Sequence, residues 1–284
     1  MSISPASGSS CCARLSPSVG WRSCTTATTR PPRQRDSVAE LIGQLKYLKL
    51  ADKTHAHWRN WFRGHSRVGW RLEPGVYRPN FGSYVNEEDR LKSEQRLYQQ
   101  FRVMSAGLRT GRESVEEIYF LQQHYRMPTR LLDWTTSALA ALYFACCGHT
   151  DVDGEIFFLD AYKFKPRDKQ SGIATSRRKE FCNAIEVINK WKDSEDFPDY
   201  IIPVRPDAFD RRITLQRSCF TFHAPNHQEL TTQENPSLNK WPVRASKKQT
   251  ILRELVLLGI DDFSIYGDLE HLAEWLKKSH NVRP

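Results

Sequence analysis

The chain has 284 residues, of which 39% are hydrophobic and 11% aromatic, an ordinary composition for a folded globular protein. Its formal net charge of +9 is unevenly distributed, because residues 1–35 contain five arginines and no acidic residue. Subtracting these five from the 42 basic residues leaves 37 against 33 acidic ones, a net charge of +4 for the rest of the chain. A surplus this small gives weak support to a general nucleic-acid-binding protein, which normally clusters its basic residues on one face.

The cysteines point to a reducing environment. There are seven of them, an odd number, without Cys-x-x-Cys spacing and below the density of a disulfide-rich scaffold. No apolar run approaches the roughly 18 residues that a membrane span needs, and the first residues lack the apolar core of a secretory signal. We therefore expect a soluble, cytoplasmic or otherwise intracellular protein that does not engage a membrane.

Residues 1–35 differ from everything that follows. They are rich in Ser, Thr, Pro and Arg and lack Asp and Glu, a composition that buries little apolar surface. We expect a disordered tail here and a single domain over residues 36–284. An organelle transit peptide is an alternative interpretation of the tail.

The domain begins with a predicted helix and a predicted strand. Apolar residues recur at helical spacing over 38–48, with Ser37 as N-cap and Glu40 three residues later as a capping box. The segment "WRNWFRGHS" at 58–66 then predicts a short strand that stops at Gly64, followed by a turn-rich loop.

Two helices are predicted next. The first covers 87–105, and the second starts at Val115 and must end or bend at Pro128. The apolar face of the first is drawn by Leu91, Tyr98, Phe101 and Met104.

After Pro128, "RLLDW" at 130–134 is short, apolar and bounded by polar residues, which predicts a buried strand. Ser137 can cap a helix that Gly148 closes. The run "GEIFFLDA" at 154–161 is typical of a strand buried on both faces.

The remaining pattern is again mixed. We expect a helix within 176–191, an edge strand or loop at 200–204 because proline interrupts it, and a strand over 212–224 because its apolar residues alternate. Helices are predicted over 247–259, with Gly259 as C-cap, and after Asp268 as N-cap. The sequence thus predicts an α+β fold, a single mixed domain with a central, mostly antiparallel sheet flanked by helices.

Several kinds of site are missing from the sequence. It contains no glycine-rich phosphate loop, no nucleophile elbow and no zinc-type cluster of Cys and His. His223 and His227 are four residues apart, but Pro225 between them excludes the helix that would put both on one face. We therefore predict no metal site.

Arg63 is the first candidate site residue. It follows three aromatic residues and precedes a glycine, which places a guanidinium at the end of a buried strand. Its planar fork of donors suits a phosphate or pyrophosphate. Pairing with a structural carboxylate such as Asp133 is the equally weighted alternative.

The segment "LQQHYRMPTRLLDWTT" supplies the other candidates. His124 is at a helix end, where the dipole favours a protonated imidazole, and Asp133 lies between leucines and a tryptophan, where an unpaired carboxylate would be costly. These groups form either a ligand pocket or a buried network in which Arg130 or Arg63 pairs with Asp133.

Five motifs carry a family resemblance: "WFRGHS", "QQHYRMPTRLLDWTTSALAALYFA", "GEIFFLDA", "RITLQRSCFTFH" and "LRELVLLGIDDFSIYGDLEHLAEWL". In this order they resemble the FRG domain, a family named after its Phe-Arg-Gly element, here Phe62-Arg63-Gly64. The resemblance covers roughly residues 37–276. In the family's "QxGxF" strand a glycine tends to stand where this chain has Ser218.

A more distant likeness is to ADP-ribosyltransferases of the Arg-Ser-Glu type. Those enzymes have an Arg-Gly on a first strand, a serine strand followed by a helix with an Ala-Leu-x-Phe-Ala pattern, and a later strand with a glutamate. The matching positions here are Arg63-Gly64, Asp133-Trp134-Thr135, the helix at 141–145, and Gln216 in place of the glutamate.

This likeness implies an ADP-ribosyltransferase-like fold and NAD as co-substrate. Arg63, Gly64, His124 and Arg130 would bind NAD, and Asp133, Thr135 and Gln216 would surround the reacting ribose, with an unidentified protein or nucleic acid as target. Gln216 cannot stabilise an oxocarbenium-like charge as an anion, so Asp133 would have to do so. The alternatives are a non-catalytic module that recognises a nucleotide or nucleic acid, and a purely structural polar network.

Overall fold

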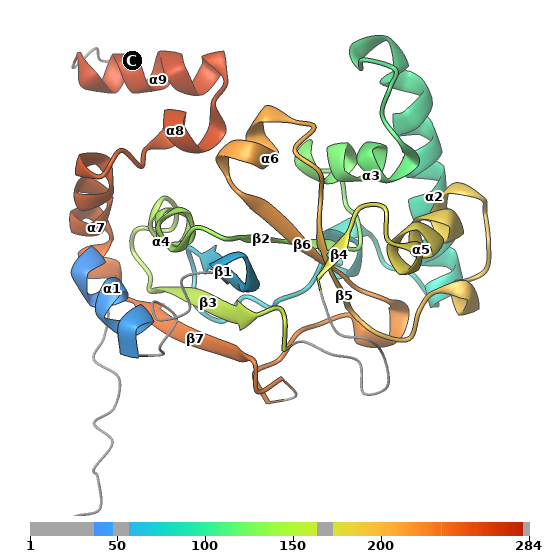
Figure 1. The fold of residues 1–284 in the computed structure, drawn as a ribbon, viewed down its shortest axis with the longest axis horizontal. Helices are drawn as coiled ribbons and strands as arrows, with labels where there is room; N and C mark the ends of the chain where they lie inside the picture. Colours follow the sequence, from blue (N-terminus) through green and yellow to red (C-terminus); the bar gives the residue numbers. More distant parts are fainter. Residues whose placement is uncertain (1–36, 48–56, 164–172, 234, 281–284) are drawn as a thin grey trace, which may run out of the picture. The chain divides into compact units, whose positions relative to one another are not determined.

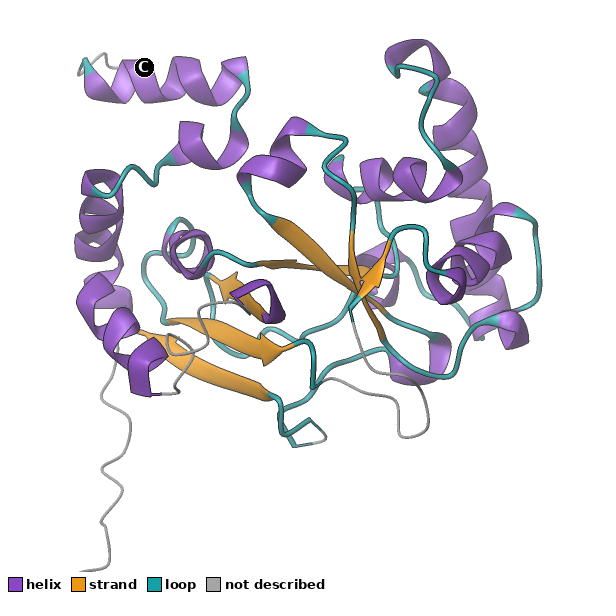
Figure 2. Ribbon diagram, viewed as in Figure 1, coloured by secondary structure: helices purple, strands orange, loops and turns teal. Residues whose placement is uncertain are grey.

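The fold is α+β, with a central sheet and helices that pack against it and surround its ends, in the computed structural model of the protein (Figures 1 and 2). The structure describes residues 37–47, 57–163, 173–233 and 235–280. Within these ranges there are nine α-helices and seven strands, which confirms the predicted mixed fold. The predicted tail at 1–35 lies outside the described residues.

The strands form one sheet in the order β4-β5-β6-β2-β1-β3-β7. Only β4 and β5 run parallel among the described strands, and every other neighbouring pair is antiparallel, as predicted. The strands are β1 (Asn60–His65), β2 (Leu131–Thr135), β3 (Gly154–Asp160), β4 (Ala174–Thr175), β5 (Ile202–Arg205), β6 (Ser218–Phe222) and β7 (Leu238–Val243).

The helices flank this sheet and surround its ends (Figure 1). They are α1 (Val38–Tyr47), α2 (Glu87–Met104), α3 (Val115–His124), α4 (Ala138–Cys146), α5 (Lys179–Asn189), α6 (Arg211–Leu215), α7 (Ala245–Leu257), α8 (Asp262–Tyr266) and α9 (Leu269–Ser279). Short 3₁₀ turns lie at His57–Arg59, Gly75–Tyr77, Pro79–Phe81, Ala106–Leu108, Ser194–Asp196 and Pro225–His227. No helix in the described ranges is long and apolar enough to cross a membrane.

Capping residues start several helices where the sequence predicts. Ser137 accepts a hydrogen bond from the backbone of Ala140 at α4, and Asp268 accepts one from His271 at α9. The helix α3 starts with a full capping box at Ser114 and ends before Pro128, as expected. The predicted apolar face of α2 is only partly correct, because Met104 is 81% exposed at the end of that helix.

The core divides into three clusters. On one face of the sheet, α4 and α7 pack over β1, β3 and β7, while α2, α3 and α5 pack over β2, β5 and β6. The opposite face holds a third cluster, which includes Trp61 of β1 and Leu132 and Trp134 of β2. Alternation along the strands explains this division, because successive side chains point to opposite faces.

The centre of the sheet is split. Whereas β1 pairs with β3 along its whole length, it pairs with β2 in the described structure only through Phe62, opposite Thr135. Beyond this pair, towards Gly64 and His65, β1 no longer forms ladder pairs with β2. The backbone groups along this part of both strands are therefore available to side chains.

Two strand predictions are corrected. The segment 212–224 is not one strand, because Arg211–Leu215 forms α6 and only Ser218–Phe222 forms β6. The Asp210 side chain caps α6 by accepting from the backbone of Arg212 and Ile213, and this local capping overrides the alternating apolar pattern.

The proline in β5 led to the prediction of an edge strand or loop. This prediction was wrong, because β5 lies between β4 and β6. Pro203 lies opposite Thr221 of β6, and the ladder with β4 begins one residue later, at Val204. The missing N–H of the proline is therefore not needed for pairing with β4. A smaller correction is that β1 continues one residue past Gly64, to His65.

A fully buried lysine joins three segments behind β1. The ammonium group of Lys248, on α7, donates to the carbonyl oxygens of Ser66 at 2.5 Å, His149 at 2.8 Å and Gly148 at 3.1 Å. Three acceptors satisfy its three N–H groups. Lys248 therefore ties α7 to the end of α4 and to the segment that follows β1.

Candidate functional site

Arg63 bridges the split between β1 and β2. Its Nη1 donates to the main-chain carbonyl oxygen of Asp133 at 2.6 Å, and the same nitrogen lies 3.6 Å from Asp133 Oδ2. The guanidinium thus takes the place of a ladder hydrogen bond where the two strands separate. Pairing with Asp133, one of the two predicted alternatives, is present, but the carboxylate contact is long.

His65 holds this guanidinium from the other side. Arg63 Nε donates to His65 Nε2 at 2.9 Å, which requires that nitrogen to be unprotonated. Burial and the neighbouring charge of Arg63 lower the pKa of His65 to about 2, so the imidazole is a neutral acceptor. Two of the three Arg63 nitrogens are therefore fixed by His65 and Asp133.

Arg63 remains a poorly neutralised cation. Burial lowers its pKa to about 10; Asp133 opposes this shift, and the nearby charge of Arg78 adds to it. Arg78 itself donates through Nε and Nη2 to the carbonyl oxygen of Glu73, at 3.1 and 3.0 Å. Two guanidinium groups thus influence each other near the split, an arrangement that favours an anionic ligand.

Asp133 is exposed in the middle of an otherwise buried strand. Its four companions in β2 are buried, whereas its side chain is 54% exposed. Gln123 Nε2 donates to Asp133 Oδ2 at 2.8 Å, and Gln123 Oε1, in the same side-chain amide, accepts from the Thr129 hydroxyl at 2.5 Å. Of the two alternatives for Asp133, a ligand pocket or a buried network, its 54% exposed side chain does not fit the buried network.

Thr135 and Gln216 meet at the end of β2. The Thr135 hydroxyl donates to the carbonyl oxygen of Gln216 at 2.7 Å and accepts from the backbone N–H of Ser137 at 2.9 Å. The family likeness predicts that Gln216 lies on a strand. In the structure it instead forms the C-cap of α6, two residues before β6. Its Nε2 is buried and has no hydrogen-bond partner among the described residues.

His124 lies beside this group, and its pKa is shifted in the direction opposite to the one that the helix dipole predicts. Its Nδ1 is 3.2 Å from Asp210 Oδ1. Burial lowers the pKa of His124, Asp210 opposes this shift and Arg212 adds to it. Desolvation therefore outweighs the helix end, and His124 is better placed to orient Asp210 than to bind a phosphate.

Gly64 faces a helix and not the split. A Cβ at this position would lie 1.9 Å from the carbonyl oxygen of Ala141 and 2.6 Å from the amide nitrogen of Ala145, both in α4. Only glycine permits this approach of α4 to β1. Its role in the structure is to let α4 pack against the strand that carries Arg63.

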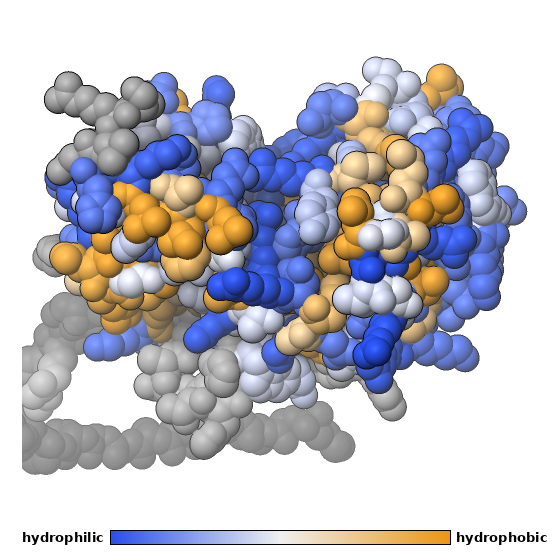
Figure 3. Space-filling model, turned by 90° about the horizontal axis from the view of Figure 1, so that it is seen from above, coloured by the Kyte–Doolittle hydropathy of each residue, from blue (hydrophilic) through white to orange (hydrophobic). Residues whose placement is uncertain are grey.

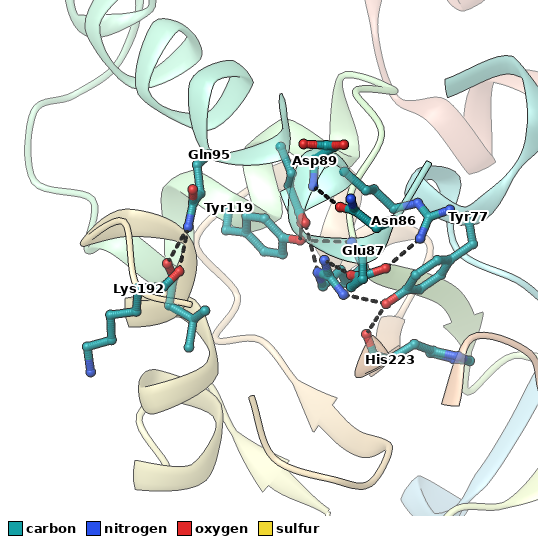
Figure 4. Close-up of polar contacts among 12 residues, drawn as sticks. Tyr77, Asn86, Glu87, Asp89, Gln95, Tyr119, Lys192 and His223 are labelled. Carbon is teal, nitrogen blue, oxygen red and sulfur yellow. Dashed lines mark hydrogen bonds and ion pairs between the residues drawn. The ribbon is translucent and has the colours of Figure 1, made fainter. Parts of the chain in front are cut away.

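Arg130 belongs to a separate, closed network, and Figure 4 labels its partners Glu87, Tyr77 and Tyr119. Its guanidinium is fully buried and contacts Glu94 at 2.8 Å and Glu87 at 2.6 Å, both in α2. It also hydrogen-bonds to the hydroxyl of Tyr77, which in turn donates to the carbonyl oxygen of His223 at 3.2 Å. The predicted pairing of Arg130 with Asp133 was wrong, because Glu94 and Glu87 occupy its donors.

The rest of this network leaves little polar capacity unused. The Tyr119 hydroxyl donates to Glu94 at 2.7 Å and accepts from the backbone N–H of Arg130 at 2.8 Å. Although burial opposes the charged form, Glu94, Tyr77 and Glu87 raise the pKa of Arg130 above its ordinary value. Arg130 thus fastens β2 to α2 and α3, and it does not face the split.

The two histidines considered for a metal have other partners. His223 Nε2 is 2.9 Å from the Thr221 hydroxyl and its Nδ1 is 3.0 Å from the carbonyl oxygen of His227, while burial lowers its pKa to about 3. His227 lies 3.2 Å from Asp199. In the part of the chain that the structure describes, no group of three or more His, Cys, Asp or Glu residues is arranged to hold a metal ion.

The structure therefore brings five of the seven candidate residues to one region and separates two. Around the split and the adjoining end of β2 lie Arg63, Asp133, Thr135, His124 and Gln216. Gly64 and Arg130 support this region from behind. The sequence analysis missed Gln123, His65, Arg78 and Asp210; of these, only His65 had a sequence signal, two positions after Arg63 on the same strand face.

Comparison with known proteins supports the first family resemblance. The family model of the FRG domain matches residues 58–154, from just before β1 into the start of β3. This match includes Arg63, Gly64, His124, Arg130, Asp133 and Thr135, and it ends before Gln216. No curated protein and no solved structure matches the chain.

Proposed function

We propose that the split between β1 and β2 binds NAD and that the domain transfers ADP-ribose to a macromolecular target. The observation that supports this most is Asp133, a solvent-exposed carboxylate at the centre of a buried strand, next to an incompletely neutralised Arg63. The strand order also fits the ADP-ribosyltransferase likeness, because β6, β2 and β1, which carry or adjoin its three motifs, are neighbours in the sheet.

In this proposal Arg63 anchors the pyrophosphate. Its Nε and Nη1 are engaged by His65 and Asp133, and Nη2 has no hydrogen bond to any described residue. That nitrogen can donate to a phosphate oxygen without breaking the contacts that orient the guanidinium. Arg78, which already influences the charge of Arg63, adds to the positive potential for the same group.

Asp133 and Gln216 act on the ribose. As the bond between nicotinamide and ribose breaks, positive charge develops on the sugar, and the Asp133 carboxylate stabilises it as glycosidase carboxylates do. The buried, unpartnered Nε2 of Gln216 supplies a hydrogen bond to a ribose hydroxyl. Thr135 fixes Gln216 through its carbonyl oxygen and sets the position of that amide.

The reaction forms one bond and breaks one. A nucleophilic oxygen or nitrogen of the target bonds to C1 of the nicotinamide ribose, the glycosidic bond breaks, and nicotinamide leaves with the electron pair. The proton of the target nucleophile is released to a base or to water. No oxidant or further co-substrate is needed.

The direct test is to incubate the purified protein with NAD and to follow nicotinamide release and thermal stability. We expect NAD to raise the melting temperature and nicotinamide to accumulate, with both effects lost in Arg63→Met. An exposed arginine of the loop before α3, in the variant Arg112→Met, is the matched control and is expected to behave as the wild type. The proposal is refuted if the wild type shows no melting shift with NAD and releases no nicotinamide.

A non-catalytic nucleotide-binding module is the second candidate. It is favoured by Gln216, a neutral amide where the likeness expects an anionic glutamate. In this version neither Arg130 nor His124 binds phosphate. The guanidinium of Arg130 is paired with two glutamates, and burial lowers the pKa of His124. A melting shift with NAD that depends on Arg63, without nicotinamide release, would identify it.

A further inference from the structure

Two helices next to the candidate site end on an arginine in a left-handed conformation. Arg126 follows α3 with φ of 63°, and Arg217 follows α6 with φ of 48°. Glycine holds the equivalent position after α7 and α8, at Gly259 and Gly267. Left-handed backbone disfavours a residue with a Cβ, so glycine is the common residue after a helix and arginine is unusual there. His149 and Trp191 are the other described non-glycine residues with positive φ.

The hydrogen bonds show that both arginines occupy true helix caps. After α3, the backbone N–H of Met127 donates to the carbonyl oxygen of Gln122, and that of Arg126 donates to Gln123, which is a Schellman motif. After α6, the backbone N–H of Arg217 donates to the carbonyl oxygen of Thr214. A glycine would fit either position at least as well as the arginine does.

The short helix α6 joins these two ends to two more arginines. At its start, Asp210 contacts His124, the last residue of α3. Along it, the Arg212 guanidinium lies 4.7 Å above the ring of Tyr266 in α8, and Arg211 faces Gly267. Burial raises the pKa of Tyr266, and the charges of Arg212 and Arg126 oppose this rise, so both act on the same phenol.

We call Arg126, Arg211, Arg212 and Arg217 the arginine rim. None of the four has an ion pair with a carboxylate among the described residues, whereas the nearby Asp210 and Asp268 each cap a helix. Figure 3 views the molecule from the side of α6 and shows a hollowed, hydrophilic band between the surface over α8 and α9 and the surface over α2 and α3. The rim lies on the helices that border this band.

An exposed aromatic side chain adjoins the rim. Tyr125, immediately before Arg126, is 65% exposed, and its ring lies 5.0 Å from that of His124. Surfaces that bind single strands combine arginines, which contact the phosphates, with aromatic rings on which bases stack. A folded acidic protein would not require an exposed ring beside the arginines, so the combination favours a nucleic acid with unpaired bases.

We propose that the arginine rim and Tyr125 bind a single-stranded nucleic acid, and that this is the macromolecule presented to the site at Asp133. The second part rests on the proposed ADP-ribosyl transfer, whereas the binding itself does not. Thr136 links the two regions directly, because its backbone N–H donates to the carbonyl oxygen of Arg217, one residue after Thr135. Tyr125 also lies near the site, because its ring is 5.0 Å from that of His124, whose pKa the charge of Asp133 influences.

The test measures binding of a fluorescently labelled single-stranded oligonucleotide, without NAD, over a range of salt concentrations. In the double variant Arg126→Gly with Arg217→Gly we expect binding weakened by roughly tenfold or more at low salt, and a salt slope reduced by roughly 0.7 for each arginine lost. Because glycine suits both backbone positions, the melting temperature should not fall. Arg112→Gly, in the loop that precedes α3, is the matched control and should bind as the wild type.

Each outcome has one meaning. Equal binding by the double variant and the wild type, absence of binding by the wild type, or tighter binding of the duplex than of the single strand would overturn the proposal. Binding that depends on the rim in a protein without nicotinamide release would uphold the nucleic-acid surface and refute the transferase. Transfer of label from NAD to the oligonucleotide by the wild type would support both.

Discussion

Two arginines of this domain, Arg63 on β1 and Arg130 immediately before β2, both lie beside acidic residues but have opposite surroundings. Arg130 is sealed among Glu87, Glu94 and two tyrosines, whereas Arg63 contacts a backbone carbonyl oxygen closely and the Asp133 carboxylate only at 3.6 Å. The first arginine has its charge neutralised by the fold. The second keeps a surplus of positive charge at a position where solvent reaches the neighbouring carboxylate.

The difference teaches which arginine belongs to the fold and which to a ligand. A buried guanidinium whose donors are all used stabilises the folded state only as long as every hydrogen-bond partner is present. A guanidinium that replaces a ladder hydrogen bond, with one nitrogen left over, can accept a phosphate without losing its position. The same residue type therefore has two roles, and substitutions should separate them.

The largest effect is expected from Arg130→Met. This change leaves the fully buried Glu94 without its cation, while Glu87 keeps its ion pair with Arg90, and it should lower the free energy of unfolding by about 3–5 kcal/mol. Urea denaturation measures it. The matched variant Arg63→Met leaves the Asp133 carbonyl oxygen and His65 Nε2 without their donor, so it should lose less, about 1–2 kcal/mol. Equal losses in the two variants would erase the distinction between them.

Next is Asp133→Asn, which removes the exposed anion but keeps its shape. If Asp133 stabilises the ribose cation, nicotinamide release should fall by about 10²–10³-fold while the melting temperature stays close to that of the wild type. The exposed Asp193→Asn serves as control, with activity expected unchanged. Full activity in Asp133→Asn would remove this residue from the reaction.

A smaller effect concerns pH. The folded-state pKa of His65, about 2, lies below its ordinary value of 6.5, so its contribution to stability is present above pH 6.5 and is lost as the pH falls through this window. Between pH 7.5 and 5.5 the loss from this histidine should be about 1.4 kcal/mol. Urea denaturation at both values, in the wild type and in His65→Gln, checks it; the variant should lose less on acidification, and an identical loss would contradict the assignment.

The smallest effect, with the opposite sign, is expected from Arg126→Gly. Replacing a left-handed arginine by glycine relieves backbone strain, which stabilises the folded state. The greater conformational freedom of glycine in the unfolded chain offsets part of this gain, so the free energy of unfolding should rise by about 0.5–1 kcal/mol. Thermal denaturation measures the change. A clear loss of stability would mean that the Arg126 side chain supports the fold, as Arg130 does.

Local patterns in the sequence predicted much of the fold. The caps at Ser137 and Asp268, the strand after Pro128 and the antiparallel character of the sheet depend on neighbouring residues, and they were found where expected. The alternating residues before Ser218 misled the prediction, because the cap at Asp210 turns the same residues into a helix.

The candidate site was less predictable because its decisive contacts are distant in the chain. The partner of Arg130 is Glu94, in a helix 36 residues earlier, and nothing in "PTRLLDW" reveals it. The exposure of Asp133, whose four companions in β2 are buried, is not visible in the apolar pattern of that segment. The residue types in the sequence therefore indicated the region of the candidate site. The structure was needed to separate the side chains that support the fold from those that are available to a ligand.

The buried ammonium of Lys248 gives the domain an internal chemical reporter. Its three N–H groups are held by carbonyl oxygens of Ser66, Gly148 and His149, so an amine-reactive reagent has neither access nor a free lone pair there while the chain is folded. Labelling at this one lysine, read by mass spectrometry, would report opening of the contact between α4 and α7. The variants at Arg63, Asp133 and Arg126 can thus be shown to be intact behind the site by a reagent that never touches the site itself.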